Sequence, residues 1–147
     1  MKDKLIEQTM SKILYVFPTW KKMTHSLKRS PSKLKMMHVM ILHAIREVGS
    51  CNMSMLSNQE HISAQQLTRV IDELVHKKYV ERWINPENRR EVLVKLTSAG
   101  EKALVEVQKL LDDSFKETLT QFDESELIKL LEAFTTIQEI IENHKRG

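Results

Sequence analysis

Residues 63–100 read SAQQLTRVIDELVHKKYVERWINPENRREVLVKLTSAG, and they carry the clearest structural signals in the chain. It begins with Ser63, a good N-cap, and continues with apolar residues at three- and four-residue steps, the pattern of an amphipathic helix. Two runs rich in β-branched and aromatic residues follow, Tyr79–Ile84 and Glu91–Leu96, with turn-forming residues at Asn85–Asn88 between them. The stretch therefore predicts a helix followed by a β-hairpin with an arginine-bearing tip.

Apolar periodicity predicts helices on both sides of this stretch. Three precede it: residues 4–29, a helix opened by Ser30–Ser32 and stopped at Gly49, and a short one around Met53–Gln59. Pro18 is expected to kink or split the first. Two long helices follow it, and their N-terminal capping signals are Ser98-Ala99-Gly100-Glu101 and Asp123-Glu124-Ser125-Glu126.

This order of elements is that of a winged helix-turn-helix, so the predicted fold is mainly α with a small β-hairpin wing. We place the winged helix-turn-helix module at 32–97 and the flanking helices at 1–30 and 98–147. The small module cannot cover the apolar stripes of these long helices, so we expect them to form a homodimer. The stripes of the first and last helices contain Ile6, Met10, Ile13, Leu14, Phe17, Leu127, Leu130, Leu131, Phe134, Ile137 and Ile141.

The composition of the 147 residues argues against several other classes of protein. Only three residues are glycine, and no P-loop, dinucleotide fingerprint or nucleophile elbow is present, so we expect neither an enzyme nor a cofactor. The six histidines show no metal-ligand spacing, and no metal is expected. The single cysteine, the lack of a signal-like N-terminus and the lack of a long apolar run favour a cytoplasmic protein away from membranes.

The helix after Ser63 and the hairpin both carry side chains suited to DNA. On a helical wheel the polar residues of the helix point away from its apolar face, and Gln and Arg can pair with adenine and guanine edges. Arginines at a hairpin tip suit the negative potential of a narrow minor groove. Taken alone, the polar helix face could simply be solvated, and the charged hairpin tip could simply be a solubilising turn. A recognition-like helix followed directly by an arginine-tipped hairpin is a more specific indication of DNA binding than either part. The candidate DNA-binding residues are Ser63, Gln65, Gln66, Thr68, Arg69, Arg82, Arg89, Arg90 and Lys95.

Residues 63–100 closely resemble the MarR family, the multiple antibiotic resistance regulators. The matching segments are Leu67-Thr68-Arg69, Asp72-Glu73-Leu74, Val80-Glu81-Arg82, Asn85-Pro86, Arg89-Arg90 and Val92–Thr97, closing on Gly100. The resemblance implies a dimeric transcriptional regulator, usually a repressor, on a palindromic DNA operator. It also implies release by a small ligand or an oxidant.

The sequence departs from the family pattern at four positions. Asn88 stands where the family usually has Asp before the wing arginines, which removes a charge that could orient the wing. Lys78 replaces the Gly before the first strand, at a cost of roughly 1 kcal/mol if that backbone is left-handed. Glu60 and His61 replace an apolar residue and Gly, so we expect a reshaped helix-turn-helix turn. The Glu60 and Asn88 changes support an alternative, a helical dimeric adaptor or antirepressor of the same fold that does not bind DNA.

The family resemblance also implies an effector site where the terminal helices meet the module. Four residues are available to line such a site: Tyr15, Trp20, His38 and His43. Cys51 is a second candidate for sensing, as a thiol redox sensor, but it has no obvious neighbouring base. A structural role is therefore the preferred interpretation of Cys51.

Overall fold

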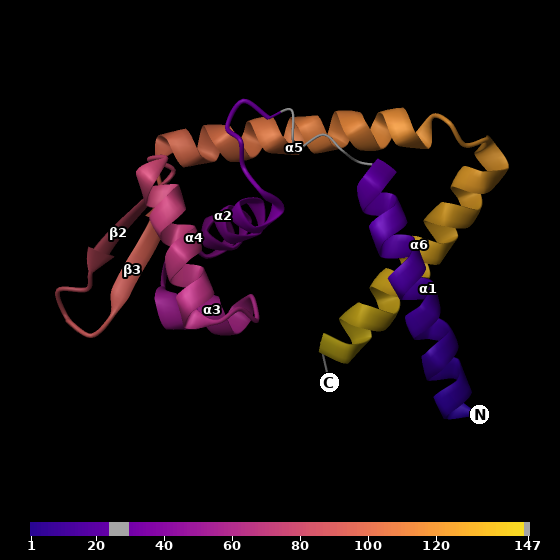
Figure 1. Cartoon of the computed structure of the whole chain (residues 1–147), viewed down its shortest axis with the longest axis horizontal. Coiled ribbons are helices and arrows are strands. Elements are labelled where there is room, and N and C mark those ends of the chain that lie inside the picture. The colour runs from indigo at the N-terminus through magenta and orange to yellow at the C-terminus, as the bar shows by residue number, and fades with distance from the viewer. Residues whose placement is uncertain (24–29, 146–147) are drawn as a thin grey trace. The chain divides into compact units, whose positions relative to one another are not determined.

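The computed structural model describes residues 1–23 and 30–145, which divide into two units (Figure 1). One unit contains Met1–Thr24 and Asp112–Gly147, and the other contains His25–Leu111. The elements are, in chain order, α1 (Lys2–Met23), α2 (Met36–Val48), β1 (Ser50–Asn52), α3 (Met53–Gln59), α4 (Ala64–His76), β2 (Val80–Ile84), β3 (Val92–Leu96), α5 (Ser98–Leu119) and α6 (Glu124–Lys145). The mainly α winged helix-turn-helix prediction is confirmed.

The core of the second unit is built from α2, α4, the start of α5 and the sheet. The apolar face predicted for α4 is buried, and its members are Leu67, Val70, Ile71 and Leu74. They pack in one cluster with Ile41, Leu42, Ile45, Val94, Leu104 and Val107. Burying each such side chain contributes about 1.5–3 kcal/mol before the entropy of ordering is subtracted. This cluster therefore holds the outer, polar face of α4 toward solvent.

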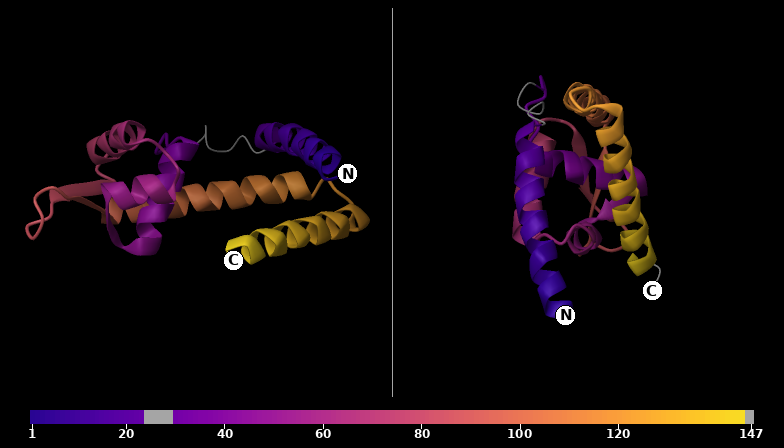
Figure 2. Two further views of the ribbon diagram at one scale, coloured as in Figure 1. Left: turned by 90° about the horizontal axis from the view of Figure 1, so that it is seen from below. Right: turned by 90° about the vertical axis from the view of Figure 1, so that its right-hand side faces the viewer.

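A three-stranded antiparallel sheet in the order β1-β3-β2 completes this unit. The hairpin β2–β3 agrees with the predicted strands to within one residue, and it projects from its unit as a wing (Figure 2). Strand β1 was not predicted. It pairs with β3 in the register Cys51↔Val94, directly after Gly49 ends α2 at φ 89°. Three residues are too short for an alternating pattern, so only the partner strand defines β1.

One predicted helix start and one predicted N-cap residue were wrong. Helix α2 begins at Met36, because Ser30–Lys33 forms a turn in which the Lys33 N–H donates to the Ser30 carbonyl at 3.0 Å. Helix α5 is capped by Thr97, whose Oγ1 accepts from the Gly100 N–H at 3.0 Å and donates to the Lys78 carbonyl at 2.6 Å. The N-cap of α5 is therefore Thr97, one residue before the predicted Ser98, and the helix itself begins at Ser98.

The first unit contains α1, α6 and the end of α5. Helix α1 continues through Pro18, so the proline does not split it; residues 24–29 of the predicted first helix lie outside the described residues. The Trp20 ring lies 5.9 Å from that of Phe115 and 6.0 Å from that of Phe134. The predicted cap of α6 is confirmed, since Asp123 and Glu126 each accept from the other's backbone N–H.

Most of the apolar stripe of this unit is exposed. Leu14 of α1 and Leu131 of α6 are about 70% and 69% exposed, and they have many exposed apolar neighbours on both helices. None of the helices in the described part of the chain is long and apolar enough to span a bilayer.

Lys78 offers a test of backbone strain. Its φ of 63° is left-handed, which costs a non-glycine residue about 1–2 kcal/mol. We expect Lys78→Gly to raise the free energy of unfolding by about 1 kcal/mol in urea titrations. The control is Glu106→Gly, at an exposed position in the interior of α5, which is expected to lower it by a similar amount. Equal losses in both variants would show that Lys78 carries no strain.

Candidate nucleic-acid interface

Helices α3 and α4 form a helix-turn-helix in which α4 presents its N-terminal half outward. Ser63 caps α4, since its Oγ accepts from the Gln66 N–H at 3.1 Å. Gln65, Thr68 and Arg69 are exposed, whereas Gln66 is half-buried. The Thr68 hydroxyl donates to the Ala64 carbonyl at 2.8 Å. The predicted outer face thus offers amide and guanidinium groups on a rigid, capped helix.

The turn between α3 and α4 keeps a left-handed residue although glycine is absent. His61 adopts φ 53° directly after Glu60, the C-cap of α3. Around it, the Ile62 N–H donates to the Ser57 carbonyl at 3.2 Å, and the Ser57 hydroxyl donates to the Ile62 carbonyl at 2.6 Å. Two hydrogen bonds between Ser57 and Ile62 therefore close the turn around His61. The turn stays closed although Glu60 and His61 replace the residues usual in the family.

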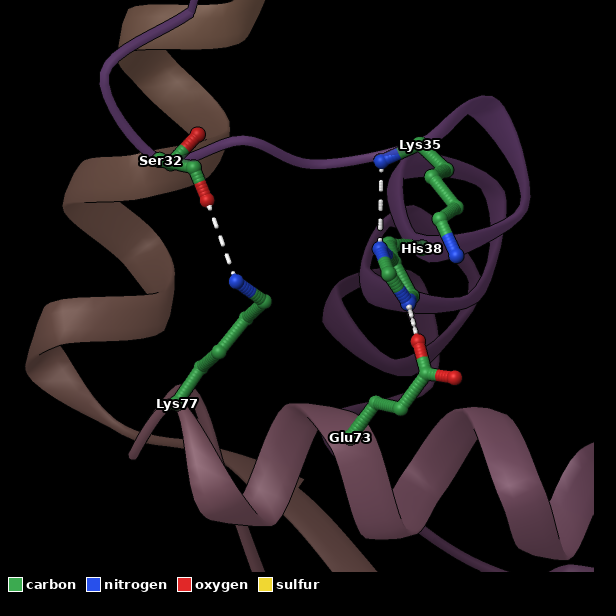
Figure 3. A network of polar contacts seen from close by, with 5 residues as sticks. All are labelled: Ser32, Lys35, His38, Glu73 and Lys77. Atoms are coloured by element: carbon green, nitrogen blue, oxygen red, sulfur yellow. Dashed lines mark hydrogen bonds and ion pairs between the residues drawn. The ribbon is translucent and has the colours of Figure 1, made fainter.

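A buried histidine joins α4 to the start of α2 (Figure 3). His38 is 2% exposed, and its Nδ1 accepts from the Lys35 N–H at 3.1 Å. Because Nδ1 is an acceptor, the ring proton lies on Nε2, which donates to Glu73 of α4 at 2.6 Å. Nearby, the Lys77 ammonium donates to the Ser32 carbonyl at 3.4 Å. Two polar contacts thus tie α4 to the segment that begins α2.

The Glu73 contact predicts a pH dependence of stability. The hydrogen bond from His38, together with the charges of Lys35 and Arg69, lowers the pKa of Glu73 below its ordinary value of 4.5. A carboxyl whose pKa is lower in the folded state stabilises the fold above its unfolded pKa, and this is lost as pH falls through the folded value. We therefore expect Glu73→Gln to lose less unfolding free energy than the wild type between about pH 5 and 3.

The control for this measurement is His38→Gln. Its amide can accept from the Lys35 N–H and donate to Glu73, so its acid dependence is expected to follow the wild type. If the unfolding free energies of the wild type and Glu73→Gln fell in parallel with pH, Glu73 would not contribute to the loss of stability in acid.

The wing tip presents its arginines on an ordered loop. Arg89 and Arg90 are exposed. The Asn88 side chain accepts from the Arg90 N–H at 3.3 Å, and the Asn88 carbonyl accepts from the Glu91 N–H at 2.9 Å. The Asn85 side chain similarly accepts from the Glu87 N–H at 3.0 Å. Asparagine at 88 thus shapes the tip through its amide oxygen without a negative charge.

Two predicted DNA-binding residues have partners within the protein. Arg82 on β2 forms an ion pair with Asp72 of α4, which connects the wing to the helix beside it. Lys95 on β3 lies 3.5 Å from the Glu81 carboxylate and 5.6 Å from the centre of the Trp83 ring. Sequence reasoning missed these partners because they lie on other elements, and spacing along the chain does not reveal them.

The four candidate effector residues have different environments. Tyr15 and Trp20 belong to the first unit, and His38 and His43 to the second. Both ring nitrogens of His38 are engaged, and His43 lies 3.4 Å from Glu47 one helical turn away. The effector site stays a prediction.

Cys51 is buried at 3% exposure, and burial raises the pKa of its thiol, which disfavours the reactive thiolate. Its surroundings agree with the structural interpretation. Among residues 1–23 and 30–145, no group of three or more His, Cys, Asp or Glu side chains is arranged to hold a metal.

The capped α4, the α3–α4 turn and the β2–β3 hairpin define the second unit as a winged helix-turn-helix. The sequence model of the MarR family matches residues 34–92, which contain α2 to the start of β3. Over these residues the chain is similar to the MarR family, and its fold is that of MarR-type winged-helix proteins.

Two curated relatives and two crystal structures show the same similarity. The uncharacterized HTH-type transcriptional regulator YpoP of Bacillus subtilis is 29% identical over 66% of this chain and 69% of its own length. The multiple antibiotic resistance protein MarR of Escherichia coli is 42% identical over 37% of this chain and 38% of its own length. The apo crystal structure of the latter has a TM-score of 0.73, with 25% identity over 86% of this chain and 94% of that chain. The crystal structure of a mutant E. coli MarR complexed with operator DNA has a TM-score of 0.68, with 24% identity over 90% of this chain and 97% of that chain.

Proposed function

We propose that the chain is a transcriptional regulator that binds double-stranded DNA through α4 and the wing. The observation that carries this proposal is the pairing of two exposed polar surfaces in one unit. Gln65, Thr68 and Arg69 are exposed on α4, whose opposite face is buried in the core. Arg89 and Arg90 are exposed on the wing of the same unit. A helix of this size fits the major groove, where these side chains can read base edges. The operator complex of the E. coli relative supports the same use of the fold.

Selection of bound duplexes from a random library tests this proposal. We expect enrichment of a palindrome whose half-sites are centred about 10 base pairs apart, since a two-fold dimer presents two α4 helices to one face of the duplex. The matched control is Arg46→Ala, which removes an exposed arginine of α2 and should enrich the same palindrome. Failure of the wild type to enrich any duplex would favour the adaptor or antirepressor alternative. The ordered turn at His61 and the ordered tip at Asn88 argue against that alternative.

The dimer is part of the same proposal, and the exposed stripes of α1 and α6 support it. We expect Ile137→Glu with Ile141→Glu, both half exposed on the α6 stripe, to convert the dimer to a monomer in sedimentation experiments, because charges would be buried in an apolar interface. The control is Thr136→Glu with Asn143→Glu, which adds the same charges outside that stripe. A dimer that tolerates the isoleucine pair would exclude α6 from the interface. Repression and release by a small effector remain expectations from the family.

A further inference from the structure

The base of the wing contains a carboxylate with two amide partners. Glu91 is half-buried, and its Oε1 accepts from Asn52 Nδ2 at 2.6 Å while its Oε2 accepts from Asn85 Nδ2 at 2.6 Å. The direction of both amides is set by the backbone. The Asn52 oxygen accepts from the Met55 N–H at 2.7 Å, and the Asn85 oxygen accepts from the Glu87 N–H at 3.0 Å. Both NH₂ groups must therefore face Glu91.

This Asn52–Glu91–Asn85 network joins two parts of the candidate interface. Asn52 is the N-cap of α3, the first helix of the helix-turn-helix. Asn85 begins the wing loop, and its backbone N–H donates to the Glu91 carbonyl at 2.9 Å. Hydrogen bonds to an ionised carboxylate are stronger than neutral ones. Glu91 thus connects the loop that carries the arginines to the helix pair that carries Arg69.

We propose that Glu91 is a positioning residue for DNA binding, which holds the arginine tip of the wing at a fixed place relative to α3 and α4. The inference rests on the proposed function. The direction in which the affinity for DNA changes when Glu91 is replaced tests this role, because a carboxylate beside a phosphate-binding loop otherwise repels DNA. If Glu91 acted only as a charge, its removal would tighten binding.

The first variant is Glu91→Gln, which removes the charge and turns an NH₂ group toward an asparagine NH₂. We expect about tenfold weaker operator binding, the size of one charge-assisted hydrogen bond. The rescue is Glu91→Gln with Asn85→Asp, which exchanges donor and acceptor and preserves the net charge. The carboxylate that Asn85→Asp introduces can still accept from the Glu87 N–H, so we expect the double variant to return to within about twofold of the wild type. Asn85→Asp alone opposes two carboxylates and should weaken binding.

Backbone amide exchange of the free protein gives a readout that needs no DNA. The N–H groups of Asn85, Asn88 and Glu91 are all bonded within the wing. We expect faster exchange at these amides in Glu91→Gln and wild-type exchange in the double variant, with α4 unchanged in both. Unchanged exchange in Glu91→Gln would overturn the proposal even if the wild type binds its operator well. Faster exchange without weaker binding would overturn the role in DNA binding. If the wild type binds no duplex, the proposed function fails, and with it the role of Glu91 in DNA binding, while the exchange data still decide whether Glu91 orders the wing.

Discussion

Replacing Arg69 with alanine is expected to weaken operator binding by about 1–3 kcal/mol in each half-site and to relax the preference at one base position. Arg69 is exposed on α4, one turn before Glu73, on the part of the helix that begins at the Ser63 cap. A bidentate contact with guanine depends on this placement, and no other base accepts it equally well. In a symmetric dimer the loss is counted twice, so this is the largest effect on affinity that we predict.

Arg90→Ala provides the comparison, because we expect a wing arginine to contact minor-groove edges and phosphates rather than major-groove base edges. We expect it to weaken binding to most sequences evenly and to flatten the salt dependence by about one unit for each phosphate that is no longer neutralised. The measurement is a set of binding curves at several salt concentrations, on the selected operator and on its single-base variants. Arg46→Ala on α2 serves as the control for the loss of one positive charge. Identical specificity profiles for Arg69→Ala and Arg90→Ala would contradict the division of roles between helix and wing.

The largest effect on stability is expected for Gly100→Ala. A Cβ on Gly100 would overlap the carbonyl oxygen of Tyr79 and lie 3.0 Å from its carbonyl carbon. That carbonyl cannot easily move, because it accepts from the Thr97 N–H at 3.1 Å, while the Tyr79 N–H donates to the Leu74 carbonyl at 2.9 Å. The first turn of α5 would have to shift away from Tyr79, the residue directly before β2. We expect a loss of about 3 kcal/mol, the upper end of the usual cost of overpacking.

Whether Gly100→Ala raises or lowers the free energy of unfolding distinguishes two views of Gly100, an ordinary helix position and a site of close backbone approach. Helix propensity alone predicts that Gly→Ala inside a helix stabilises by about 1 kcal/mol. The close approach to Tyr79 predicts the opposite, and unfolding in urea measures the difference directly. Ser98→Ala, at the exposed start of α5, is the control and should change stability by less than about 0.5 kcal/mol. A stabilised Gly100→Ala variant would show that α5 and Tyr79 do not approach this closely.

The sequence predicted what depends on neighbouring residues and missed what depends on distant ones. Helix α4 combines a capping serine with a clear 3.6-residue apolar pattern, so its start and its buried face were both predicted. Strand β1 has three residues, and its only definition is pairing with β3 more than 40 residues later. The contact of His38 with Glu73 spans 35 residues, and that of Arg82 with Asp72 joins two different elements. No local pattern in the sequence marks these side chains as partners, so their contacts could be identified only from the folded structure.

The positions of the two tryptophans have a practical consequence for spectroscopy. Trp20 is packed against Phe115 and Phe134 in the unit that contains α1 and α6, and Trp83 lies in the wing beside the Lys95 ammonium. The chain contains only these two tryptophans, so its tryptophan fluorescence has one emitter in each unit. Trp20→Phe leaves an emission that reports on the wing alone, and Trp83→Phe leaves one that reports on the terminal helices. Dissociation of the proposed dimer and contact with the proposed duplex can then be followed as separate optical signals in unlabelled protein.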